Sequence, residues 1–159
     1  MRRFLVLAAM VALFASPLTA RAAEPGMTLS VDSVQLIAKV VVKVDVTFTC
    51  QPRTIPEPPW RTWFEMPMFY LQIQQAVGKQ QATAAAEADF DGDALCDGLP
   101  HSLTITAVAD GSGPPFRKGP AAMKVSGYAT YMLENTETGE QHWVSQDATT
   151  GWVQVKLGS

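Results

Sequence analysis

The sequence has few of the side chains from which metal sites and active sites are usually built. Among its 159 residues there are two cysteines and two histidines, namely Cys50, Cys96, His101 and His142. A structural zinc site takes four cysteine or histidine ligands, and no third or fourth soft ligand accompanies the cysteines along the chain. This scarcity argues against a metal-binding or catalytic use of the cysteine pair.

The sequence also lacks a nucleophile elbow of the kind that hydrolases use. A histidine, a serine and an aspartate do follow one another at His142, Ser145 and Asp147. Catalytic triads are recognised by their geometry in space, however, so closeness along the chain carries no weight. We therefore expect a protein that is not an enzyme, and we keep a small secreted hydrolase or enzyme inhibitor as an alternative.

No apolar run is long enough to anchor the chain in a membrane. The N-terminus, MRRFLVLAAMVALFASPLTARAAEP, has a basic start, an apolar stretch over residues 4–15 and small residues around Ala22. A membrane-spanning helix needs about 20 apolar residues, and this shorter pattern is typical of a secretory signal peptide. We expect residues 1–22 to be cleaved and residues 23–159 to form a single secreted, extracellular domain.

Positive charge is scarce in the part that is expected to remain. The chain has 12 lysines and arginines against 15 aspartates and glutamates, and three of the arginines, Arg2, Arg3 and Arg21, lie in the signal peptide. This leaves 9 basic and 15 acidic side chains, and 9 − 15 gives a net charge of −6. Nucleic acids and anionic membranes select clustered positive charge, so neither is expected as the main partner.

The two cysteines are expected to pair with each other. In an exported chain, two cysteines most simply form one disulfide. A Cys50–Cys96 bridge would close a loop of about 46 residues. In the chain-entropy estimate, such a bridge stabilises a fold by about 4 kcal/mol.

The mature sequence is rich in alternation between apolar and polar residues. From Leu36 to Cys50 every even-numbered residue is apolar, and a period of two is that of a half-buried strand or pair of strands, with Cys50 on the inward face. Similar alternation recurs, separated by turn-forming residues, over residues 69–74, 103–107, 123–131 and 153–157. The pattern predicts an all-β fold, an antiparallel β-sandwich of about 7–9 strands around a buried disulfide.

Two further segments have less regular patterns. In KQQATAAAEADF, residues 79–90, alanine and glutamate favour a helix by propensity, but the apolar side chains keep strand parity. We predict a strand that returns from a turn at Gly78, with a short helix as the alternative. QPRTIPEPPWRTW, residues 51–63, is predicted to be a long loop because each proline lacks an amide donor.

Three pieces of the chain carry a resemblance: VDVTFTCQP, LCDGLPHSLTITAVADGSGPPFRKGPAAMKV and the closing WVQVKLGS. A strand ending in cysteine, a Cys-Asp-Gly-x-x-His turn and a Pro-Phe-x-x-Gly-x-Ala strand opening resemble small secreted actinobacterial immunoglobulin-like β-sandwich proteins of unknown function. The resemblance spans roughly residues 44–126. It implies an immunoglobulin-like fold in which Cys50 and Cys96 match the bridging pair, and it implies no catalytic or ligand-binding residue.

The first candidate site is the aromatic segment PPWRTWFEMPMFYLQ. Its aromatic and methionine side chains fall on both parities, so a single inward face cannot bury all of them. Exposed rings offer contact area at a low cost in conformational entropy. We expect a ligand-contact surface formed by Trp60, Trp63, Phe64 and Tyr70. In the alternative interpretation, the tryptophans close the open end of the sandwich.

The second candidate site is the acidic stretch ADFDGDALCDG, residues 88–98. It holds four aspartates, Asp89, Asp91, Asp93 and Asp97. Carboxylates at such spacing can surround a calcium ion, which prefers oxygen ligands. The alternative is a solvated acidic turn that delivers Cys96 to its partner. Calcium is the only cofactor that the sequence suggests.

These observations favour a secreted or cell-surface binding module for a protein or carbohydrate, without catalysis. The alternative is a calcium-dependent adhesion or carbohydrate-binding protein that uses the acidic stretch.

Overall fold

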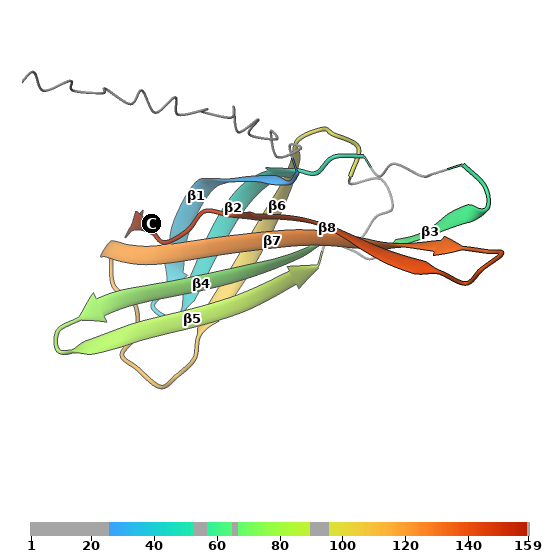
Figure 1. The fold of residues 1–159 in the computed structure, drawn as a ribbon. Coiled ribbons are helices and arrows are strands. Elements are labelled where there is room, and N and C mark those ends of the chain that lie inside the picture. The colour runs from blue at the N-terminus through green and yellow to red at the C-terminus, as the bar shows by residue number, and fades with distance from the viewer. Residues whose placement is uncertain (1–25, 53–56, 65–66, 90–95, 159) are drawn as a thin grey trace, which may run out of the picture.

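The computed structural model describes residues 26–52, 57–64, 67–89 and 96–158. In these ranges the chain is all-β, as predicted, and forms nine strands (Figure 1). The strands are β1 (Thr28–Ala38), β2 (Val41–Thr49), β3 (Trp60–Phe64), β4 (Met68–Val77), β5 (Gln80–Asp89), β6 (His101–Ala109), β7 (Gly119–Asn135), β8 (Gln141–Thr149) and β9 (Val153–Leu157). The described ranges contain no helix that could cross a membrane.

All neighbouring strands pair in antiparallel fashion and belong to one hydrogen-bonded sheet. The sheet runs in the order β1-β2-β6-β5-β4-β7, and β8 and β9 pair with β7 as well. The sheet curls so that β1 lies beside the end of β9. The amide of Leu36 in β1 donates to the carbonyl of Gly158, which follows β9, at 2.8 Å. The result is two facing layers, one around β2 and β6 and one around β4 and β7.

The long strand β7 belongs to two parts of the molecule. Its first part pairs with β4 and β9, and its last residues pair with β3 and β8. In Figure 1 this second part extends to one side, beyond the ends of β4 and β5. We call β3, with the paired residues 131–135 of β7 and 141–144 of β8, the arm, and the remainder the body.

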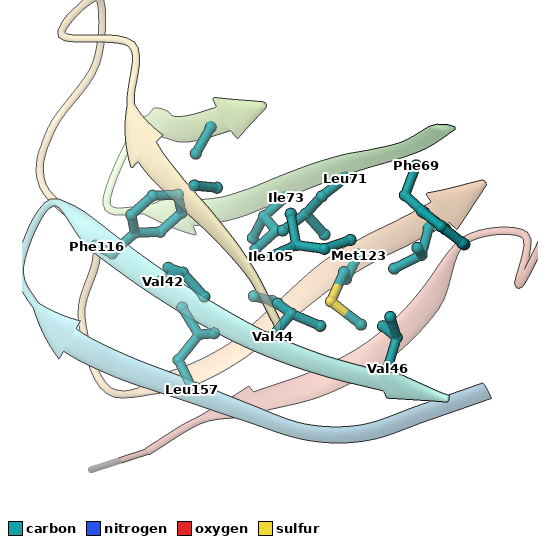
Figure 2. Packing of buried hydrophobic residues seen from close by; sticks show 14 of the residues in the cluster. Val42, Val44, Val46, Phe69, Leu71, Ile73, Ile105, Phe116, Met123 and Leu157 are labelled. Carbon is teal, nitrogen blue, oxygen red and sulfur yellow. The ribbon is translucent and has the colours of Figure 1, made fainter. Parts of the chain in front are cut away.

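The core lies between the two layers of the body (Figure 2). The inward residues predicted for β2, from Val42 to Phe48, are fully buried, and so are Phe69 and Leu71 of β4. The ring centroids of Phe48 and Phe69 lie 4.7 Å apart. Since β2 and β4 are not neighbours in the sheet, this contact joins the layers face to face. Each large apolar side chain buried in this way contributes roughly 1.5–3 kcal/mol.

The predicted disulfide between Cys50 and Cys96 is present. Cys50 is buried and Cys96 half-buried, and the amide of Gly98 donates to the carbonyl of Cys50 at 3.0 Å. Cys50 follows β2 and Cys96 precedes β6, and these two strands are neighbours in the sheet. The bridge therefore joins the ends of adjacent strands, whereas the immunoglobulin bridge crosses between two sheets.

The two less regular segments have different outcomes. Residues 80–89 form strand β5, as predicted, paired with β4 through the two-residue turn Gly78–Lys79. The prediction of a loop throughout residues 51–63 is wrong at its end, because Trp60–Phe64 form β3 and pair with β7. No proline occurs between Pro59 and Pro67, so every amide of β3 can donate to a neighbouring strand, and its aromatic residues suit strand structure.

Candidate binding surface

The aromatic residues predicted to form one contact surface lie on two strands, β3 in the arm and β4 in the body. Trp60 is half-buried, and its ring packs against the ring of His142 with centroids 5.4 Å apart. Trp63 is 50 % exposed. Phe64 is placed by its backbone pairing with Tyr131. Tyr70 lies in the body, on β4. Trp60, Trp63 and Tyr70 therefore do not share one surface, and Trp63 is the exposed tryptophan among them.

The ring of Trp63 is held by two charged side chains. Its Nε1 donates to Oε2 of Glu134 at 2.9 Å, and Nε of Arg61 donates to the same oxygen at 2.7 Å. The Arg61 guanidinium also lies 4.7 Å from the centroid of the Trp63 ring, within the range of a cation–π contact. The hydrogen bonds from Trp63 and then Arg61 lower the pKa of Glu134. These contacts hold the indole in one orientation while half of it stays open to solvent.

A second exposed tryptophan joins Trp63 across the arm. The backbone register places Trp63 opposite Met132 and Met132 opposite Trp143. Residues directly opposite one another in an antiparallel sheet lie on the same face. Trp143 is 59 % exposed, so two open rings flank Met132 on one side of the arm. We call the surface formed by Arg61, Trp63, Met132, Glu134 and Trp143 the arm face.

Tyr70 lies on the outer side of the body and stacks on Tyr128. The two rings are 5.8 Å apart and nearly parallel, at 15°, and their hydroxyl oxygens are 3.3 Å apart. The hydrogen bond with Tyr128, followed by burial and by nearby negative charge, raises the pKa of Tyr70 to about 12. Because the Tyr128 hydroxyl donates to Sδ of Met68 at 3.1 Å, the Tyr70 hydroxyl is the donor toward Tyr128 and its own oxygen can still accept a hydrogen bond.

The described part of the acidic stretch behaves as a turn. Oδ1 of Asp97 accepts from the amide of Leu99 at 2.7 Å and from Nε2 of His101 at 2.9 Å. These hydrogen bonds, that from His101 first, lower the pKa of Asp97. Asp89 is exposed at the end of β5. Asp91 and Asp93 lie outside the described residues, so the alternative of calcium binding by this stretch is untested.

His142, Ser145 and Asp147 do not come together on one face of β8. Ser145 and Asp147 share one side of β8, and His142 lies on the opposite side because strand residues alternate. Among the described residues, no group of three or more histidine, cysteine or acidic side chains is arranged to hold a metal ion.

The sequence pattern does not reveal the partners of Trp63. Arg61 is a neighbour on the same strand, but Met132, Glu134 and Trp143 join Trp63 only through strand pairing, and Glu134 lies 71 residues away along the chain. The signal that could have indicated part of this surface is the turn sequence NTETGE, residues 135–140. It predicts a hairpin, and the alternation on its two arms then places Met132 near Trp143.

No protein-family model, curated protein or solved structure matches this chain. The resemblance to secreted actinobacterial immunoglobulin-like proteins therefore stays a prediction.

Proposed function

We propose that this chain is an exported, non-catalytic binding module and that the arm face is its contact surface. The observation that carries the proposal is the pair of half-exposed indoles, Trp63 and Trp143, held on a paired sheet on either side of Met132. Tryptophan and arginine are enriched among the residues that dominate binding energy at interfaces.

The arm face is organised before any ligand arrives. Glu134 accepts hydrogen bonds from both Trp63 and Arg61, so its carboxylate positions the indole and has a structural role. A ring that is already fixed loses little conformational entropy on binding, which leaves more of the contact energy for affinity. A ligand with a flat or gently curved surface, either a protein or a carbohydrate, would fit an open sheet face of this kind.

Export is supported by two independent features. The N-terminal residues carry the charge, apolar run and small residues of a signal peptide, and the described chain holds a disulfide between Cys50 and Cys96. Disulfides persist in oxidising compartments outside the cytoplasm. N-terminal sequencing of the protein from a culture medium should begin at Ala23, and recovery of the intact N-terminus from the cytoplasm would contradict export.

The binding function is tested by comparing the wild type with the double variant Trp63→Ala, Trp143→Ala. Each tagged protein is incubated with cell-wall material and with culture-medium proteins of the source organism. We expect retention of the wild type and at least about tenfold weaker retention of the double variant. The variant Val108→Ala, which removes an exposed apolar side chain from β6 on the other layer, serves as the control. Equal retention of the wild type and the double variant would contradict the arm face as the contact surface.

A further inference from the structure

A recessed surface lies on the outer side of the body, separated along β7 from the arm face. Three contiguous depressions of about 300 to 350 Å³ each occur there, and Gln72 of β4 lines all three. Tyr70 lines two of them, and Trp152 borders the third. We call this surface, centred on Tyr70, Gln72, Gln74 and Trp152, the groove.

The backbone under the groove cannot take part in recognition. β4 pairs with β5 on one edge and with β7 on the other, and Gln72 lies opposite Ala85 and Lys124. The amides and carbonyls of β4 are therefore used within the sheet. A peptide that adds a strand needs a free sheet edge, and the centre of this face offers none. Ligands in the groove can be recognised only by side chains.

The side chains available there are mostly uncharged and able to hydrogen bond. Gln72 is exposed, and its amide makes no hydrogen bond within the described ranges of the chain. A side-chain amide offers two N–H donors and a carbonyl acceptor. Tyr70 donates its proton to Tyr128 and adds a hydroxyl oxygen that can accept, and Gln74 adds a second amide, whose oxygen accepts from Gln81.

The charged side chains at the borders of the groove leave a small negative excess. Glu87 lies on the β5 side, Lys124 on the β7 side, and Asp110 beside Trp152. The carboxylate of Asp110 already accepts hydrogen bonds from Thr83 and Ser112. Two carboxylates and one ammonium leave one net negative charge, which disfavours an anionic ligand. Trp152, which is 52 % exposed, contributes an aromatic surface beside the amides. Uncharged donors and acceptors next to an open ring suit a molecule with many hydroxyl groups around apolar C–H faces.

The groove is long and open, which suits a chain of sugar units. Tyr70 and Gln74 are four residues apart on β4, which corresponds to about 13 Å along the strand. We propose that the groove binds a neutral oligosaccharide chain lying along β4, with Gln72 hydrogen bonding to sugar hydroxyls and Trp152 packing against a sugar ring. This site is separate from the arm face and does not depend on it.

Titration calorimetry tests the proposal with the disulfide-bonded protein. The probes are linear hexasaccharides of glucose, mannose, xylose and N-acetylglucosamine, the matching disaccharides, and hexagalacturonate as an acidic comparator. We expect at least one neutral hexasaccharide to bind, roughly tenfold more tightly than its disaccharide because a disaccharide fills only part of the groove. Trp152→Ala and Gln72→Ala should weaken that binding by about tenfold and about fivefold. Gln35→Ala, which removes an exposed amide from β1 in the other layer, should bind as the wild type does.

The outcomes separate this proposal from that for the arm face. Circular dichroism and thermal melting first establish that each variant is folded, which both substitutions should permit because Gln72 and Trp152 are exposed. Absence of binding to every neutral hexasaccharide, or wild-type affinity in both groove variants, would overturn the groove as a glycan site. Loss of binding only in Trp63→Ala, Trp143→Ala would assign the sugar to the arm face and likewise overturn it.

Discussion

Gly127 of β7 lies directly against the ring of Phe69 in β4. The two residues are paired across the strands, and a Cβ atom at position 127 would stand 2.7 Å from Cε1 of that ring. Met27 closes the same space, with its Cε 3.0 Å from that position. Phe69 is fully buried, and its ring also packs against the ring of Phe48 with centroids 4.7 Å apart, so side chains border it on more than one side.

Gly127→Ala should therefore destabilise the protein. Overpacking of a filled core costs roughly 1–3 kcal/mol, and urea denaturation followed by fluorescence should show this loss. Gly158→Ala is the matched control, because no atom lies within 4 Å of the added Cβ there. Equal stability of Gly127→Ala and the wild type would mean that the ring of Phe69 can move aside.

Removing the disulfide should lower stability without changing the architecture. The bridge spans 46 residues, and loss of such a cross-link costs about 4 kcal/mol through the greater freedom of the unfolded chain. Denaturation of the wild type with and without reductant, and of Cys50→Ala, Cys96→Ala, measures this loss. An unchanged midpoint after complete reduction would contradict it.

Acid should release the ring of Trp63. The pKa of Glu134 lies below its ordinary value of 4.5, first through the hydrogen bond from Trp63. The stability that Glu134 contributes is therefore present above pH 4.5 and is lost as the pH falls through the lowered pKa. Tryptophan fluorescence should change in that acidic range in the wild type. In Glu134→Gln, which carries no titrating carboxylate at this position, the same step should be absent, and its persistence would assign the change elsewhere.

Alkali should reveal Tyr70 as a late-titrating tyrosine. Its pKa is raised from 10.0 to about 12, first through the hydrogen bond with Tyr128. Because the folded-state pKa is the higher one, the associated stability is complete below pH 10 and is lost as the pH rises through about 12. Absorbance of tyrosinate should show this late step, and Tyr128→Phe should shift it toward lower pH. A Tyr70 that titrates at its ordinary value would contradict the role of Tyr128.

Calcium should leave the melting midpoint unchanged. Oδ1 of Asp97 already accepts hydrogen bonds from Leu99 and His101, and a calcium ligand at that oxygen would have to replace them. A site that binds only the folded state raises the midpoint as the ligand concentration increases. Melting curves with chelator and with millimolar calcium make the comparison, and a rise with calcium would favour the calcium-binding alternative.

The sequence predicts the core better than the surface, for a physical reason. Alternation from Val42 to Phe48 reports local geometry, since side chains of a strand point to opposite faces in turn, and those residues are indeed buried. The strand at Trp60–Phe64 escaped prediction because the prolines before it dominate the local pattern. Strand pairing with β7 then decides its structure.

The candidate surfaces depend on register between distant strands. Trp63 donates a hydrogen bond to Glu134. Gln72 lies opposite Ala85 of β5 and Lys124 of β7 in the backbone register. A shift of one residue in either pairing would turn a whole strand face from solvent to core. The aromatic segment therefore predicts exposed rings, but not that Trp60 and Tyr70 lie apart from Trp63.

The continuity of β7 joins the proposed contact surface to the hydrophobic core. The same strand supplies Met123 and Val125 to the core and Met132 and Glu134 to the arm. The arm is anchored only through the part of β7 that is buried in the core. When that part unfolds, the strand pairing of the arm should be lost with it. Substitutions that destabilise the core should therefore also lower the affinity proposed for the arm face, even when every residue of that face is unchanged.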